Sequence, residues 1–272
     1  MLVERTFEGG AVPIHYAEEP GSGPPLLLLH GVTSRWQNFL NVLPVFTTRW
    51  HVVAADLRGH GRSGHAEGHY GLMEYAADII ALLRHLSDQP AVLIGHSLGA
   101  MISIGVAAEA PELVRAVVLE DPPLTAFDGR PFTARAEHDR FVTMRDLARQ
   151  GHAAAELAKL LASTIPEGND VAVRTRAASL SQIDPEVLTA IIENRSIAQY
   201  DLGERLRRIV CPTLLLQGNP ALGGALTDEE ADWAKSLISD CAHVSLPHVG
   251  HGIHAADGPA FSQTVVSFLE AL

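Results

Sequence analysis

The sequence predicts an α/β fold: a doubly wound, mostly parallel sheet of eight strands, with helices inserted after the sixth strand. Short apolar runs that suit buried parallel strands alternate along the chain with amphipathic stretches that suit helices. The alternation breaks between residues 124 and 208, where no run is convincing as a strand. With 272 residues, 47% of them hydrophobic, the chain is long enough for one large domain with an insertion.

The predicted elements follow one another in a regular order. Two short edge strands are expected around residues 4–8 and 13–16, followed by buried strands at residues 26–29, 51–55, 91–94, 114–119, 213–217 and 242–246. Helices are expected at residues 72–86, 98–110, 227–238 and 259–269, and within the insertion at residues 134–149, 153–164 and 185–194. We therefore expect a core domain formed by residues 1–123 and 209–272 and a helical insertion formed by residues 124–208.

Composition and charge restrict the partners of the chain. It has 32 acidic and 20 basic residues, and the net charge of -12 opposes non-specific binding to nucleic acid or to an anionic membrane. Small substrates that are neutral or weakly charged fit this balance better. The first residues lack a basic segment followed by an apolar core, so we expect no secretory signal and a cytoplasmic protein. No apolar run is long enough to span a bilayer, and the oligomeric state is not indicated.

Cysteines and histidines give little sign of a metal or redox site. Cys211 and Cys241 are expected to be reduced structural residues, because nothing suggests export and no activating base lies near them in the sequence. His65 and His69 are four residues apart, and three further histidines are spaced three apart at positions 248, 251 and 254. No carboxylate or cysteine signature accompanies either set, so we expect no metal and no other cofactor.

The stretch Gly95-His96-Ser97-Leu98-Gly99 is the most informative motif. An apolar run precedes it and a helix-forming run follows it, so the chain must turn from strand to helix within one residue. Such a turn strains the backbone of the central serine and exposes its hydroxyl beside the first amides of the helix. The motif therefore predicts that Ser97 is a nucleophile.

A serine hydroxyl needs a base to remove its proton, and His251 is the best candidate. It follows the last predicted strand and precedes the last helix, which places it on a loop at the carboxyl edge of the sheet. Ser97 is expected at the same edge, where the two side chains can meet. His248 and His254 are weaker candidates that are expected to flank or line the site.

Acyl transfer also needs donors for the negative charge that develops on the carbonyl oxygen. One donor of this oxyanion hole is expected to be the backbone N–H of Leu98, the residue after the nucleophile. The second is expected to be the N–H of Val32, since Gly31 follows the third strand and permits a turn into the site. A plain strand-to-loop glycine is the alternative for Gly31.

Several motifs together resemble the α/β-hydrolase family, and the likeness covers essentially the whole chain. The residues that carry it are His30-Gly31, residues 56–63, residues 95–99, residues 211–218 and Gly250-His251. The resemblance implies that residues 56–63 form a structural turn. It also implies that the helical insertion is a cap domain that covers the active site and supplies much of the acyl pocket.

The third member of the catalytic triad departs from the family pattern. Members usually place an aspartate shortly after the seventh strand, but here Asn219 stands there and no carboxylate follows closely. The family also uses an acid at the end of the sixth strand, and this chain has Glu120 and Asp121 at that point. We expect Asp121 to be the acid, with Glu120 and Asp228 as alternates. Asp228 lies near a predicted helix start, where its charge has a local role.

The resemblance and the motifs predict a serine esterase that cleaves carboxylic esters or lactones through an acyl-enzyme. A serine at the elbow excludes the related dehalogenases and epoxide hydrolases, which use an aspartate there. Carboxylesterase and lactonase activities both remain, with N-acyl homoserine lactones as one specific possibility. The alternatives are a C–C bond hydrolase or perhydrolase of the same fold, and a ligand receptor or binding module with little turnover.

Substrate contacts are less well defined by the sequence. Besides Gly31, the expected pocket residues are Trp36 after the third strand, Met101 on the helix after Ser97, and three residues of the insertion, Phe132, Phe141 and Met144. For each of these apolar side chains, packing in the core is the alternative.

Overall fold

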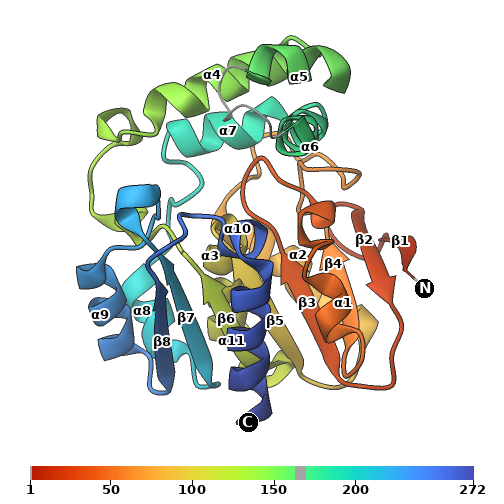
Figure 1. Ribbon diagram of the computed structural model, residues 1–272, viewed down its shortest axis with the longest axis vertical. Coiled ribbons are helices and arrows are strands. Elements are labelled where there is room, and N and C mark those ends of the chain that lie inside the picture. Colours follow the sequence, from red (N-terminus) through yellow and green to blue (C-terminus); the bar gives the residue numbers. More distant parts are fainter. Residues whose placement is uncertain (1, 163–169) are drawn as a thin grey trace.

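The computed structural model describes residues 2–162 and 170–272. Its centre is an eight-stranded sheet in the order β1-β2-β4-β3-β5-β6-β7-β8 (Figure 1). The β1–β2 and β2–β4 pairs are antiparallel, and all other pairs are parallel. The predicted fold class is confirmed. The strands are β1 (Val3–Phe7), β2 (Ile14–Glu19), β3 (Pro25–Leu29), β4 (His51–Ala55), β5 (Ala91–His96), β6 (Val114–Glu120), β7 (Thr213–Gly218) and β8 (Cys241–Leu246).

Both faces of the sheet are buried, which is why the strands are continuous apolar runs. Along β3, Leu27 and Leu29 belong to the hydrophobic core on one face, while Leu26 and Leu28 belong to the core on the other. Successive side chains of a strand point to opposite faces, so a run of four leucines fills both cores.

Helices cover the two faces of the sheet. Side chains of α2 (Leu72–Leu86), α3 (Leu98–Glu109), α8 (Leu202–Arg208) and α9 (Asp228–Leu237) enter the core on one face. Side chains of α1 (Leu43–Phe46) and α11 (Gly258–Glu270) enter the core on the other face, and α11 stands in front of the sheet in Figure 1. This arrangement is the doubly wound architecture that the alternating pattern predicts.

A separate layer of helices lies beyond one end of the sheet, at the top of Figure 1. It contains α4 (His138–Arg149), α5 (Ala154–Leu161), α6 (Asp170–Leu180) and α7 (Pro185–Ile192), all between β6 and β7 in the chain. Polar contacts tie this layer to the sheet: Arg35 Nη1 donates to Gln182 Oε1 (3.0 Å), and the Asp184 N–H donates to the Gly59 carbonyl (2.7 Å). The division into core and cap domains stays a prediction.

Some elements within residues 124–208 differ from the sequence prediction. Helix α6 was not expected, because Val171, Val173 and Thr175 are β-branched residues with weak helix propensity. Helix α8 was also not expected, and it packs against α3 and α9. The predicted helix at residues 153–164 is observed as α5, and its expected last residue, Thr164, lies outside the described residues.

No helix among residues 2–162 and 170–272 has the length and apolar character needed to cross a membrane. Within the same ranges, no group of three or more histidine, cysteine or acidic side chains is arranged to hold a metal ion. Cys211 and Cys241 are both free thiols. Burial raises the pKa of each thiol to about 11, so both are protonated at neutral pH.

Candidate active site

Strand β5 ends at His96 and helix α3 begins at Leu98, so Ser97 alone makes the turn between them. Its backbone has φ 54° and ψ -113°, a conformation that residues with a side chain rarely adopt. The hydroxyl is thereby held at the carboxyl edge of the sheet, beside the first N–H groups of α3. This is the strand-to-helix turn that the motif predicts.

The glycines on either side of this turn allow backbones to approach closely. A Cβ atom at Gly95 would lie 2.3 Å from the carbonyl oxygen of Gly99. A Cβ atom at Gly99 would lie 2.1 Å from the carbonyl oxygen of Leu29, on the neighbouring strand β3. Both distances are far below van der Waals contact, so any larger residue would displace the turn that holds Ser97.

His251 lies on the loop between β8 and the short helix α10 (Ile253–Ala256). The Ser97 hydroxyl is 2.9 Å from Nε2 of His251, and Nδ1 of His251 is 2.7 Å from Oδ2 of Asp121. With the proton on Nδ1, the imidazole donates to Asp121 and accepts from the serine hydroxyl. The three side chains come from three strand ends and form one hydrogen-bonded chain.

Asp121 follows β6 directly and is fully buried. Its carboxylate accepts the backbone N–H groups of Gly218 (3.0 Å) and Ala225 (2.7 Å), and more weakly that of Leu226 (3.4 Å). These donors lie at the end of β7 and in the loop that follows it. They fix the carboxylate and stabilise its negative charge away from water.

The structure does not bring the alternate acids to His251. Glu120 binds His254, as described below, and Asp228 accepts a hydrogen bond from Nε2 of Gln217 (2.8 Å) at the start of α9. Neither alternate, Glu120 or Asp228, is in the position of the triad acid. Among the described carboxylates, Asp121 is the one in contact with His251. Glu120 is the last residue of β6, whereas Asp121 leaves the strand with a positive φ of 46°, and their carboxylates point in different directions.

Asn219 stands where the family usually has the acid, and it has a different contact. Its side-chain amide donates to the carbonyl oxygen of Pro247 (2.7 Å), and its backbone N–H donates to that of Val249 (2.7 Å). Both acceptors lie on the loop that carries His251. Asn219 thus fixes the loop of the base without touching the imidazole.

The loop after β3 packs directly against the nucleophile. A Cβ atom at Gly31 would lie 3.1 Å from Cβ of Ser97, and both Val32 and Leu98 line the same cavity as the serine. Leu98 is the first residue of α3, so its N–H has no acceptor within the helix. The backbone of this loop is braced by His30, whose Nδ1 donates to the Gly31 carbonyl (2.8 Å).

A second histidine–carboxylate pair lies beside the three residues. His254 binds the buried Glu120 through both Nδ1 and its backbone N–H, each at 2.8 Å. Burial raises the pKa of Glu120, but the electrostatic interaction and the hydrogen bonds with His254 outweigh burial and lower it. The His254 ring lies 5.1 Å from that of His96.

His96 links this pair to the base. Its Nε2–H donates to the backbone carbonyl of His251 (3.0 Å), and burial lowers the pKa of its imidazole to about 4, so it is neutral at neutral pH. The sequence predicts that His254 flanks or lines the site, but it indicates neither the contact of His96 with the loop of the base nor the pairing of His254 with Glu120. His248 has no contact with this network: it is 56% exposed and pairs with Asp257.

A cavity of about 1190 Å³ opens onto Ser97 and His251. Residues of the sheet edge form one wall of this cavity, and residues of α4 and α6 form the opposite wall. Most of the predicted pocket residues do line it: Gly31, Met101, Phe132, Phe141 and Met144.

Trp36 is the exception, and its expected role as a pocket residue is wrong. Its side chain is 4% exposed and packs in the core on the α11 face, with Leu28 and Ile94. Its backbone N–H donates to Oδ1 of Asp56 (2.9 Å). Trp36 is the first residue of a 3₁₀ helix (Trp36–Phe39) whose two buried side chains, Trp36 and Phe39, belong to this core.

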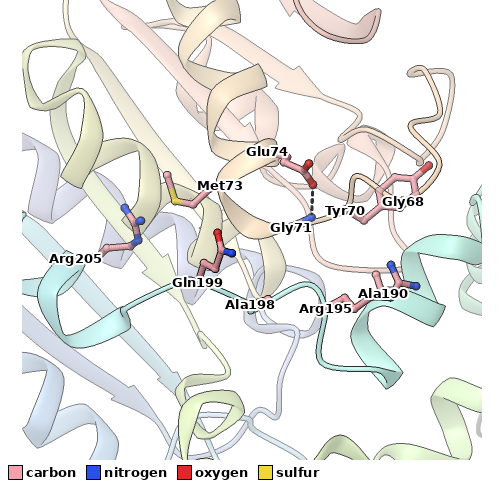
Figure 2. A pocket seen from close by; sticks show the side chains of 10 residues that line it. All are labelled: Gly68, Tyr70, Gly71, Met73, Glu74, Ala190, Arg195, Ala198, Gln199 and Arg205. Carbon is pink, nitrogen blue, oxygen red and sulfur yellow. Dashed lines mark hydrogen bonds between the residues drawn. The ribbon is translucent and has the colours of Figure 1, made fainter.

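Figure 2 shows a second, smaller pocket of about 450 Å³, which α2 and the chain near residues 195–205 enclose. None of the described residues that line it is a serine, cysteine or histidine. The Glu74 carboxylate in this pocket accepts the Gly71 N–H (2.8 Å), which closes the first turn of α2. This pocket therefore lacks the groups that acyl transfer needs.

Comparison with known proteins places the fold and the geometry in context. A family model of the alpha/beta hydrolase fold matches residues 24–255. The 2-(acetamidomethylene)succinate hydrolase of Mesorhizobium japonicum is 29% identical, over 99% of this chain and 96% of that protein. The magnesium-chelatase 30 kDa subunit of Rhodobacter capsulatus is 31% identical, over 92% of this chain and 88% of that protein.

Comparison with solved structures also finds a hydrolase of this fold. The crystal structure of E-2-(acetamidomethylene)succinate hydrolase matches with a TM-score of 0.79 and 25% identity. The match covers 99% of this chain and 100% of that one. The similarity therefore extends over the sheet, its covering helices and the layer beyond the sheet.

Proposed function

Because this chain belongs to the α/β-hydrolase family, we propose that it is a serine hydrolase that cleaves carboxylic esters or lactones. The acyl group is small to medium in size and is carried by Ser97 as an acyl-enzyme intermediate. Ser97 acts as nucleophile and His251 as general base and acid. Asp121 orients His251 and stabilises the positive charge that forms on its imidazole.

The observation that carries this proposal is the unbroken hydrogen-bonded chain from Ser97 through His251 to Asp121 beside a large cavity. Each member satisfies a separate requirement. The serine is held in a strained turn, the base contacts it at 2.9 Å, and the buried acid fixes the tautomer of the base.

Acylation follows from this arrangement. As His251 Nε2 removes the hydroxyl proton, Oγ of Ser97 attacks the carbonyl carbon, and the carbonyl oxygen becomes an oxyanion between the N–H groups of Val32 and Leu98. The imidazolium then gives its proton to the leaving alkoxide, and the C–O bond breaks. The alcohol leaves, or the opened lactone stays attached through its acyl end.

Deacylation repeats these steps with water. His251 removes a proton from water, hydroxide adds to the acyl carbon, and the returning proton releases the Ser97 hydroxyl and the free acid. His96 supports both steps, because its hydrogen bond to the His251 carbonyl holds the backbone of the base in place.

We further propose that residues 124–208 act as a cap over this site. In support, Phe132, Phe141 and Met144 come from this segment and line the cavity opposite Ser97. An apolar wall of this kind favours acyl chains longer than acetyl.

Labelling with a fluorophosphonate probe tests the nucleophile. Wild-type protein is expected to form a covalent adduct at Ser97, and Ser97→Ala is expected to form none. A panel of aryl esters of graded acyl length, together with N-acyl homoserine lactones, then identifies the substrate class. A wild-type protein that neither labels nor hydrolyses any of these compounds contradicts the proposal and favours a binding role.

Amide cleavage is a second candidate, because one relative is named as the hydrolase of an acetamido compound. The same residues serve that reaction, with His251 protonating an amine in place of an alkoxide. Matched ester and anilide substrates with the same acyl group separate the candidates. Comparable kcat/KM on the two favours amide cleavage, and turnover of the ester alone favours the esterase.

A further inference from the structure

The charge of the cavity is opposite to the charge of the chain. The protein as a whole has 32 acidic and 20 basic residues, yet its cavity is lined by four arginines and a single acidic residue, Glu137. The net charge of the chain favours neutral substrates, but the field inside the cavity attracts anions. The arginines that line the cavity are Arg130, Arg135, Arg140 and Arg176.

Two of these arginines share one carboxylate of the protein. Arg130 and Arg135 both bind the carboxylate of Asp128, at 2.7 and 2.8 Å. They form a structural cluster with Asp128 in the segment between β6 and α4, where both guanidinium groups are ion-paired within the protein. Their presence in the lining does not by itself indicate a ligand.

Arg140 and Arg176 differ, since neither contacts a carboxylate among the described residues. Arg140 lies on α4 with its guanidinium carbon 5.5 Å from the centre of the Phe141 ring. Arg176 lies on α6, and its Nη2 is 4.0 Å from Sδ of Met144. Phe141 and Met144 also line the cavity, so both cations are placed against its apolar wall.

Arg176 is half-buried, and its environment disfavours its charge. Burial lowers the pKa of its guanidinium, and the positive charge of Arg140 lowers it further. Arg140 is exposed, so the cost of charge falls mainly on the half-buried Arg176, and an anion between the two cations would offset it. Within the described residues, these two cations therefore form a positive site that no carboxylate contacts.

The two arginines of the second pocket differ from Arg140 and Arg176. Arg195 binds both Glu186 and Glu193 at 2.5 and 2.7 Å, and Arg205 binds Glu109 at 2.6 Å. Both arginines of the second pocket are therefore paired with acids. Arg140 and Arg176, in the cavity that opens onto Ser97, have no acid partner among residues 2–162 and 170–272.

We propose that the substrate carries a carboxylate and that Arg176, together with Arg140, binds this group on the α4 and α6 side of the cavity. The inference rests on the proposed hydrolytic function, because the bound group is the end of the substrate remote from the carbonyl that Ser97 attacks. The planar guanidinium fork binds carboxylate or phosphate oxygens through paired hydrogen bonds. Both anions are therefore included in the test.

Kinetics on matched esters test the proposal. Aryl monoesters of succinate, glutarate and adipate carry a terminal carboxylate, and aryl esters of equal length that end in a methyl group do not. For wild-type protein we expect kcat/KM to favour the anionic ester by about 10-fold or more at one of these lengths. In Arg176→Gln this ratio should fall toward one, mainly through a higher KM for the anionic ester.

Two further variants separate binding from folding. Arg174→Gln removes an exposed arginine of the same helix that does not line the cavity, and the ratio should stay at the wild-type value. Arg176→Lys keeps the charge without the fork and should retain part of the preference. Equal kcat/KM for charged and neutral esters at every length, or a wild-type ratio in Arg176→Gln, overturns the proposal.

Binding to Ser97→Ala tests the site without turnover and so distinguishes its failure from that of the hydrolase proposal. Glutarate should raise the Tm of Ser97→Ala but not that of Ser97→Ala/Arg176→Gln. Stabilisation by inorganic phosphate with none by dicarboxylates overturns the assignment to a carboxylate. No stabilisation by succinate, glutarate, adipate or phosphate overturns the anion site itself.

Discussion

The Nδ1 atom of His251 lies 2.7 Å from Oδ2 of Asp121, an acid at the end of β6. The adjacent strand holds this acid in place, because Gly218 at the end of β7 and Ala225 in the following loop donate their N–H groups to its carboxylate. Asp121, which follows β6, therefore orients His251. Backbone N–H groups at the end of β7 and in the loop after it in turn fix Asp121.

Replacing this acid should abolish most of the turnover. Asp121→Asn is expected to lower kcat on an aryl ester by about 10³- to 10⁴-fold, since an amide at this position favours the wrong tautomer of His251. Steady-state kinetics on the purified variant measure the loss. Asp228→Asn is the matched control and should remain close to wild type, because Asp228 contacts Gln217 instead. Near-normal kcat in Asp121→Asn would contradict the assignment.

The strained turn at Ser97 should be visible in the free energy of unfolding. Ser97→Gly is expected to be more stable than Ser97→Ala by about 1 kcal/mol, because glycine adopts a positive φ without a Cβ clash. Both variants lack the hydroxyl, so the difference reports the backbone alone. Denaturant unfolding of the pair measures it, and equal stability would show that the turn is not strained.

The close approach at Gly99 predicts a large loss of stability. Gly99→Ala places a Cβ 2.1 Å from the Leu29 carbonyl and should cost more than about 3 kcal/mol or prevent folding. Gly203→Ala has its nearest neighbours at 3.6 Å or more on α8 and should instead gain about 0.5–1 kcal/mol from helix propensity. Thermal unfolding of both variants checks the opposite signs. A tolerated Gly99→Ala would contradict the packing described here.

Stability should fall as the pH drops below about 6.5. Burial lowers the pKa of His30 to about 4 and, with the charge of His30, lowers that of His60 to about 3. The unfolded chain takes up protons on these rings near pH 6.5 and the folded protein does not, so the free energy of unfolding decreases from about pH 6.5 down to about pH 3. The Tm measured across this range should drop less steeply in His60→Gln than in wild type. The exposed His69→Gln should keep the wild-type slope.

The strand-to-helix turn and the base could be predicted because their signals are local. An apolar run, a glycine-flanked serine and a helix-forming run occupy consecutive residues, and His251 follows a strand of its own. The residues of each motif therefore determine the local backbone conformation around Ser97 and around His251. The parallel order of strands then places both motifs at one edge of the sheet.

The choice of acid and the charge of the cavity depend on side-chain directions that the sequence does not encode locally. Glu120 and Asp121 are adjacent, and the positive φ of Asp121 (46°) turns its carboxylate toward β7. Arg176 lies on a helix with weak propensity that was not predicted, and its unpaired charge emerges only when α6 packs near α4. The direction of the Trp36 side chain likewise depends on a non-local feature, the packing of the 3₁₀ helix that begins at this residue.

The pairing of β6 with β7 has an evolutionary consequence. The Asp121 carboxylate after β6 accepts the N–H of Gly218 at the end of β7 (3.0 Å), and the next residue, Asn219, donates to the loop that carries His251 (2.7 Å), so the ends of both strands lie close to the base. A lineage can therefore acquire an acid on one strand before losing it from the other and keep a working base at every step. Homologous sequences that lack an aspartate after the seventh strand should be searched at the sixth before they are classed as inactive.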